Sequence, residues 1–156
     1  MSLQNIGLKE IPERKVLYLK CQGPWRQLPE KLDELQLHVM ARGYSPIGPY
    51  FGIYYNTPME VSVEDLHWEI CCPIEAETRG IEEKDPRFGV RKIPAKRMAA
   101  TIHLGSFRKT APTYALLEEW LDKNDSKVSG PAEEVYLSGL INKQEEVKIE
   151  IRLPVL

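Results

Sequence analysis

The sequence lacks the features that would mark it as a membrane or nucleic-acid-binding protein. No apolar run approaches the roughly 20 residues that span a bilayer, and the first residues have neither the basic start nor the apolar core of a signal peptide. Its 21 lysines and arginines are interleaved with 23 acidic residues, and the net charge is -2. We therefore expect a cytoplasmic protein that binds neither membranes nor nucleic acid directly.

Cysteine and histidine are also scarce. The cysteines, Cys21, Cys71 and Cys72, are odd in number and lack the spacing of a disulfide framework. Cys71 and Cys72 fall on a predicted strand, where adjacent side chains face opposite ways and cannot easily share a metal. The three histidines are scattered. The sequence therefore predicts buried, reduced thiols, no metal and no other cofactor.

The 156 residues suit one domain, 1–156, with a substantial core. Apolar periodicity, broken by glycine and proline, predicts the helices and strands. Strands are predicted at 15–21, 50–55, 66–72, 98–104, 134–137 and 147–153, and helices at 28–39 and 111–121. Residues 75–94 are predicted to be an exposed connection, with a short strand near 88–91.

The two halves of the chain match each other. The segment 23–26 (GPWR) corresponds to 105–108 (GSFR), and Tyr54 corresponds to Tyr136 at the same offset in the numbering (105 − 23 equals 136 − 54). One offset held across separate blocks indicates a tandem duplication of a strand-helix-strand-strand unit. Two copies favour one pseudo-symmetric domain over a solenoid. The repeats are predicted at about 15–74 and 97–156.

Two such units side by side predict an α+β fold with two layers. We expect a mainly antiparallel sheet with both helices on one face. The opposite face is expected to curve over a ligand groove at the junction of the repeats, because such junctions are favoured places for small-molecule sites.

One predicted strand carries an acid that suits this groove. Successive strand side chains alternate, so Glu134 and Tyr136 share one face while Val135 and Leu137 share the other. If the apolar face packs on the core, the carboxyl and the phenol face the groove. Gly52 stands where the second repeat has Glu134. The alternative is an ordinary solvated strand face, since glutamate is usually exposed.

Five segments occur in the order and spacing of a known family. They are 89–100 (GVRKIPAKRMAA), 103–107 (HLGSF), 117–121 (LEEWL), 134–137 (EVYL) and 150–155 (EIRLPV). Together they make the chain resemble the GyrI-like effector-binding family from about Lys15 to its end. The resemblance implies a duplicated fold with a ligand groove between the halves. It also implies kinship with the drug-sensing parts of AraC-type and MerR-type regulators, with gyrase inhibitors, and with hydrolases of DNA-alkylating natural products.

The resemblance also implies roles for single residues. Glu134 falls on the family's central acid and Tyr136 on the tyrosine two residues later. Trp120 is a candidate aromatic by its place in the second helix, with a core position as the alternative. Because no DNA-binding helix-turn-helix precedes the first predicted strand, we expect a stand-alone member and not a complete regulator.

We favour a small-molecule binder for flat aromatic or cationic compounds. Aromatic rings stack on such ligands, and a desolvated carboxylate pairs with a cation. Burial in an empty groove should raise the pKa of the acid, and a cationic ligand should lower it. The candidate ligand-binding residues are Glu134, Tyr136, Tyr54, Tyr50, Trp68 and Trp120.

Two alternatives stay open. A hydrolase on the same frame would use Glu134 as an acid or to position water, assisted by Tyr136, and would open electrophilic cyclopropane rings. No Gly-x-Ser-x-Gly elbow or Cys–His pair supplies another nucleophile. The other alternative is an inhibitor that acts on a protein partner such as DNA gyrase.

Overall fold

The computed structural model describes residues 6–139 and 146–156, which form eight strands and two α-helices. The strands are β1 (Gly7–Ile11), β2 (Arg14–Gln22), β3 (Phe51–Tyr54), β4 (His67–Ile74), β5 (Phe88–Ile93), β6 (Lys96–Gly105), β7 (Ala132–Tyr136) and β8 (Val147–Pro154). The helices are α1 (Leu28–Arg42) and α2 (Ala111–Lys123), and the 3-10 turns are η1 (Trp25–Gln27) and η2 (Val63–Asp65).

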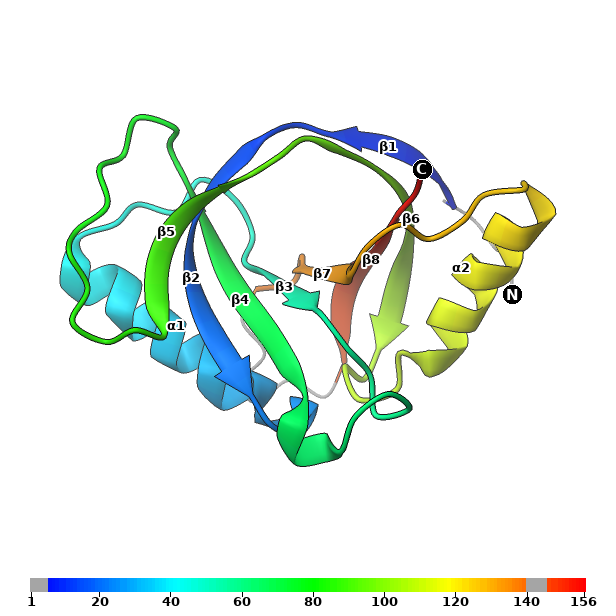
Figure 1. The fold of residues 1–156 in the computed structure, drawn as a ribbon, viewed down its shortest axis with the longest axis horizontal. Coiled ribbons are helices and arrows are strands. Elements are labelled where there is room, and N and C mark those ends of the chain that lie inside the picture. Colours follow the sequence, from blue (N-terminus) through cyan, green and yellow to red (C-terminus); the bar gives the residue numbers. More distant parts are fainter. Residues whose placement is uncertain (1–5, 140–145) are drawn as a thin grey trace.

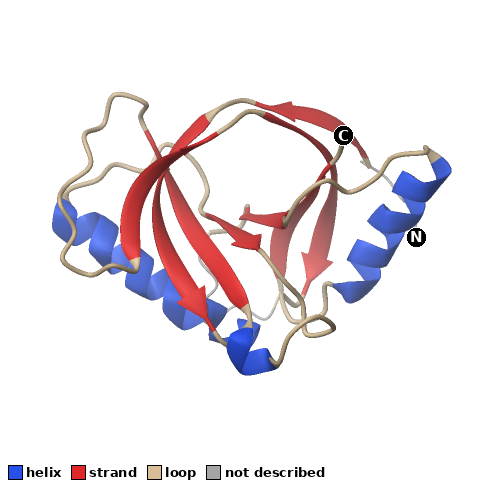
Figure 2. Cartoon of the chain, in the orientation of Figure 1, coloured by secondary structure: helices blue, strands red, loops and turns tan. Residues whose placement is uncertain are grey.

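The strands form one sheet in the order β1-β6-β8-β7-β3-β4-β2-β5, and all neighbouring pairs are antiparallel. The sheet is strongly curved, with the short strands β3 and β7 at its centre and one helix on either flank (Figures 1 and 2). The predicted α+β class, antiparallel sheet and two helices are confirmed. Within the described residues, neither helix has the length and apolar character needed to cross a membrane.

Both helices begin where the sequence predicts, and they extend two or three residues beyond the predicted ends. Pro29 and Pro112 occupy the first turns of α1 and α2, where proline removes no intrahelical hydrogen bond. Gly43 ends α1 with φ of 76°, a left-handed conformation that glycine adopts at little cost. The buried side chains of each helix lie at helical spacing. They are Leu28, Leu32, Leu35 and Val39 in α1, and Leu117 and Leu121 in α2.

The repeat extends further than the sequence analysis predicted, because β1 was missed. Strand β1 matches β5, since Gly7 and Gly89, like Ile11 and Ile93, are related by the offset between the repeats. Each of these strands pairs with the other half of the chain: β1 with β6, and β5 with β2. This exchange places both strands at the edges of the sheet. Strand β1 escaped prediction because it is short and its side chains are mostly exposed.

The sheet has an apolar core on each face. The larger core, here called the helix-face core, includes buried residues of both helices together with Trp68, Tyr136 and Ile151. The smaller core, on the opposite face, consists of Val16, Phe51, Ile53, Cys71, Ile93 and Val135. An apolar strand face therefore does not reveal which side of the sheet carries the helices, and this bears on the predicted position of Glu134.

The expectation that Glu134 faces away from the helices is wrong. Tyr114 of α2 contacts Glu134, and Tyr136 belongs to the helix-face core. The alternation of side chains along β7 is as predicted, but Val135 packs into the smaller core on the other face. Because both faces are apolar at this point, alternation alone could not tell which face carries the helices.

The three cysteines are free and buried, as predicted. Burial raises the pKa of the Cys21 thiol to about 12 and that of Cys72 to about 11. These thiols are therefore packing residues and not nucleophiles at neutral pH.

Candidate functional site: a buried acid in an aromatic shell

The candidate site lies at the junction of the two repeats. Glu134 of β7 stands opposite Gly52 of β3, which is the residue at the equivalent position of the other repeat. A Cβ atom at Gly52 would come within 2.8 Å of the Tyr54 hydroxyl and 2.9 Å of the Tyr136 hydroxyl. The two phenols therefore lie over Gly52, and a side chain there would displace them. The duplication thus places an acid in one repeat and space for two phenols in the other.

Glu134 is buried without a cationic partner. Its residue is 7% exposed, and the hydroxyl of Tyr114 donates a hydrogen bond to Oε2 over 2.6 Å. No ion pair to Glu134 is found among the described residues. Burial raises its pKa to about 7, although the hydrogen bond from Tyr114 acts to lower it. Burial therefore favours the protonated form of this acid more than in an exposed glutamate.

The adjacent residue, Glu133, shows the opposite arrangement. Its side chain is fully buried on the other face of β7, and Arg14 binds it through two hydrogen bonds of 2.7 and 3.0 Å. The guanidinium of Arg14 also lies 4.8 Å from the ring centre of Phe51. A buried carboxylate usually needs such a partner. Two neighbouring acids are thus buried, and only Glu134 lacks a counter-charge.

Two tryptophan rings, Trp25 and Trp68, flank the tyrosine pair Tyr54 and Tyr136. These four rings are here called the aromatic shell. The hydroxyls of Tyr54 and Tyr136 are hydrogen-bonded to each other. The ring of Trp25 meets Tyr54 edge-on at 5.6 Å, and the ring of Trp68 stacks on the same tyrosine at 5.9 Å. The Trp68 indole N–H donates to the carbonyl of Gly23 over 3.0 Å, whereas the buried indole N–H of Trp25 has no partner among the described residues.

The predicted residues divide into two groups. Glu134, Tyr136 and Tyr54 come together as expected. Trp68 is 1% exposed and supports Tyr54 by stacking on its ring. Tyr50 and Trp120 are half-buried against the helix-face core, and the structure shows neither in contact with Glu134.

Tyr50 lies beside a thiol. Burial raises the pKa of this tyrosine well above its usual value, and the neighbouring thiol of Cys72 acts in the same direction. Trp120 packs against the helix-face core, which is the alternative to a ligand-binding role predicted for it from the sequence. These two aromatics therefore support the sheet and helices around the site.

Sequence reasoning missed Tyr114 and Trp25. Tyr114 lies at helical spacing with buried Leu117 and Leu121, so its pattern predicts only a core residue. Trp25 matches Phe107 in the repeat, but an aromatic pair at equivalent positions does not indicate a ligand. The contact between Tyr114 and Glu134 depends on α2 packing against the sheet, which periodicity does not specify.

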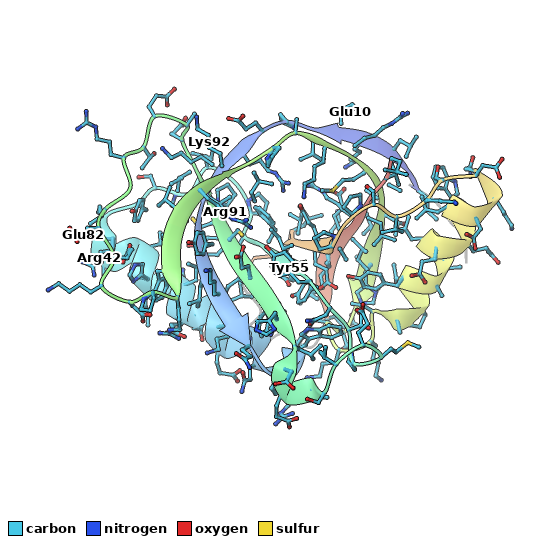
Figure 3. All side chains as sticks on the ribbon, viewed as in Figure 1. Glu10, Arg42, Tyr55, Glu82, Arg91 and Lys92 are labelled. Atoms are coloured by element: carbon cyan, nitrogen blue, oxygen red, sulfur yellow. The ribbon has the colours of Figure 1, made fainter. Side chains whose placement is uncertain are left out.

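The opposite face of the sheet carries polar groups that are already paired. Arg91 donates to Tyr55 over 3.0 Å and to Glu69 over 2.5 Å; Arg91 and Tyr55 are labelled in Figure 3. Its counterpart at the equivalent position of the other repeat is Lys9, which pairs with Glu150 at 2.5 Å. Burial acts to raise the pKa of Glu150, but the cations beside it hold that pKa below its usual value. The unpaired acid is therefore on the helix face.

A two-repeat α+β domain that holds an unpaired acid inside an aromatic shell is organised as a small-molecule-binding domain. The chain belongs to the GyrI-like family, because the family model described as "GyrI-like small molecule binding domain" matches residues 4–156. The family resemblance inferred from the sequence is thus confirmed.

Comparison with individual proteins agrees with this assignment. A protein of Erwinia billingiae (strain Eb661) named DNA gyrase inhibitor is 28% identical over 154 residues, which is 97% of each chain. The EcmrR C-terminal domain superposes with a TM-score of 0.82 at 23% identity over 99% of both chains. In the cryo-EM structure of an EcmrR–DNA complex, the match (TM-score 0.83, 24% identity) covers 99% of this chain but 58% of EcmrR.

Two more distant structures share the fold. A hydrolase from Listeria innocua has a TM-score of 0.70 at 15% identity, covering 100% of this chain and 94% of that one. The structure of SAV2435 bound to tetraphenylphosphonium has a TM-score of 0.59 at 12% identity, covering 98% and 94%. At these identities the likeness shows a common fold.

Proposed function

We propose that this domain binds aromatic, cationic small molecules at the helix-face site, with the carboxylate of Glu134 as their counter-charge. The observation that carries the proposal is the contrast between two adjacent buried acids. Glu133 has Arg14 as its partner, whereas Glu134 has a phenol and no cation. A ligand cation would complete the second pair.

Desolvation favours such a ligand. Removing a carboxylate from water costs several kcal/mol unless a cation compensates it, and here the fold has already removed Glu134 from water. The rings of Tyr54 and Trp25 supply faces that attract a cation and stack on an aromatic frame. The binding of tetraphenylphosphonium by SAV2435, which shares the fold, supports this ligand class.

Ligand entry requires the aromatic shell to open. Glu134 is buried, and it lines neither the cavity beside β1 nor the cavity beside the start of α1. We infer that the ring of Trp25 moves, because it is half-buried and sits on the single turn of η1. The hydrogen-bonded, fully buried Trp68 would stay in place.

The test is a titration of tryptophan fluorescence with tetraphenylphosphonium. Glu134→Gln should weaken binding about tenfold to a hundredfold, the usual cost of losing a charge-assisted partner. In the wild type, affinity should rise between about pH 5.5 and about pH 8, because the acid must lose its proton to pair with the cation. The variant should show no such rise.

Two controls make this test specific. Glu119→Gln removes an exposed carboxylate from α2 and should leave binding unchanged. Triphenylphosphine oxide, an uncharged aromatic ligand, should bind wild type and Glu134→Gln alike. Equal affinity of both proteins for tetraphenylphosphonium would refute the role proposed for the acid.

Hydrolysis is the second candidate, favoured by the protonated fraction of Glu134 at neutral pH. The acid would protonate a carbonyl conjugated with the cyclopropane while water adds to a ring carbon. The electrons of the broken carbon–carbon bond would form the enol, and the proton released by the water would return to the carboxylate. The Listeria innocua protein with this fold is named a hydrolase. Ring-opened product detected by chromatography with wild type, and lost with Glu134→Gln, would establish this activity. Binding without product would leave the domain a binder.

Action on DNA gyrase is a third candidate, supported by the name of the Erwinia billingiae relative. A supercoiling assay with purified gyrase measures it directly. Inhibition that is equal for wild type and Glu134→Gln would place the interaction on a surface separate from the acid. Inhibition that requires Glu134 would connect it with the ligand site.

A further inference from the structure

A cavity of about 440 Å³ lies between the start of α1 and the loop that precedes α2. Its walls come from both repeats. The residues that line it are Arg26, Gln27, Glu30, Lys31, Glu34 and Arg108.

Two arginines, Arg26 and Arg108, face this cavity from equivalent positions of the two repeats. Each follows an aromatic residue, Trp25 or Phe107, that packs against the helix-face core. Both arginines are exposed, and neither forms an ion pair within the described parts of the chain. The pseudo-symmetry of the fold thus brings two guanidinium groups to one cavity.

The acids of the cavity do not neutralise this pair. Glu34 already binds Arg87 at 2.6 Å and lies 3.7 Å from Lys31. Glu30 is exposed in the first turn of α1, where the helix dipole favours a negative charge. The cavity therefore retains positive charge on the side formed by Arg26 and Arg108.

Trp25 connects this cavity with the acid site. Its ring lies against Tyr54 in the aromatic shell, and the next residue in the chain, Arg26, lines the cavity. The buried indole N–H of Trp25 has no acceptor among the described residues. A ligand that displaces this ring would have the acid at one end and the arginines at the other.

We propose that the domain prefers amphoteric aromatic ligands, which carry an amine cation and an anionic group on one planar frame. The cation pairs with Glu134, the frame stacks in the aromatic shell, and the anionic group lies between Arg26 and Arg108. Guanidinium groups suit this role because they donate paired hydrogen bonds to carboxylate, sulfonate or phosphate oxygens. The inference rests on the proposed function, since it assumes that Glu134 binds the cation.

The test compares two dyes that differ in one charge. Tetramethylrhodamine carries a free carboxylate beside its cationic ring system, and its methyl ester carries the cation alone. The wild type should bind the free acid about five- to tenfold more tightly than the ester, as two partly exposed ion pairs would give. Raising the salt concentration from about 0.05 M to about 0.5 M should reduce this ratio through screening.

Two variants test whether the arginines of the cavity cause the difference in affinity between the dyes. Arg26→Gln/Arg108→Gln should bring the ratio of the two dissociation constants close to one. The matched control is Arg42→Gln, which removes an arginine from the opposite end of α1 (Figure 3) and should leave the ratio at its wild-type value. Circular dichroism confirms that each variant is folded.

The outcomes separate this inference from the proposed function. If binding of the ester requires Glu134 but the free acid binds no more tightly than the ester, the anion site is refuted and the cation site stands. A gain that survives in the double arginine variant also refutes the anion site. If neither dye depends on Glu134, the proposed function itself is wrong.

Discussion

The buried acid should make the stability of this domain fall as the pH rises. In the folded protein the pKa of Glu134 lies at about 7 instead of 4.5, because burial disfavours the charged form. Between these two values the folded state holds a proton that the unfolded state has released. By linkage, the free energy of unfolding decreases as the pH rises through this window. Glu134→Gln replaces the titratable carboxyl group with a neutral amide of the same size.

The magnitude follows from the two pKa values. Each pH unit within the window contributes about 1.4 kcal/mol, so the wild type should lose about 3 kcal/mol between about pH 4.5 and about pH 7.5 from this group. That is a large part of the roughly 5 to 15 kcal/mol typical of a folded domain. Glu134→Gln should not lose it, and should therefore be the more stable protein at about pH 8.

Urea unfolding followed by tryptophan fluorescence measures this effect. The quantity of interest is the difference in free energy of unfolding between variant and wild type, because titrations common to both proteins cancel. It should rise from about pH 5 to about pH 8 and then level off. Tetraphenylphosphonium should reduce the rise by supplying the missing cation.

The matched control is Glu119→Gln, whose exposed carboxylate should give a pH-independent difference. If the free energies of unfolding of wild type and Glu134→Gln change in parallel with pH, the acid keeps an ordinary pKa in the folded protein. The electrostatic basis of the proposed site would then be wrong.

Three further substitutions test the geometry. Gly52→Ala should cost about 1 to 3 kcal/mol of stability, measured by urea unfolding, because its Cβ would overlap the two phenol hydroxyls. Tyr114→Phe should move the pH midpoint of the stability profile above about 7, since it removes the hydrogen bond that lowers the pKa of Glu134; an unchanged midpoint would contradict the contact. Arg14→Met should cost about 3 to 5 kcal/mol by leaving Glu133 buried without its partner, and Arg14→Met/Glu133→Gln should recover part of that loss in thermal unfolding.

Local chemistry made much of this protein predictable from its sequence. The helices follow from apolar spacing and from proline and glycine at their ends, and these signals act within a few residues. The constant offset between the two halves revealed a repeat because both copies retain the same turns. The alternation along β7 placed Glu134 with Tyr136 and apart from Val135. None of these inferences needs contacts between distant segments.

Strand β1 marks the limit of such reasoning. Its five residues are mostly exposed, so its place in the sheet comes from pairing with β6 of the other repeat. Tyr114 presents the same difficulty, because a half-buried helical tyrosine is typical of any core. Only the packing of α2 against the sheet makes it the donor to Glu134.

The sequence by itself determined the family, the duplicated α+β fold, and the acid and two tyrosines of the candidate site. Tertiary structure decided on which face of the sheet that acid lies, and that it is buried without a cation while Glu133 has one. It also decided that the two repeats bring Arg26 and Arg108 to one cavity. The physical reason is that burial and charge pairing depend on side chains from distant segments, whose packing no local pattern specifies.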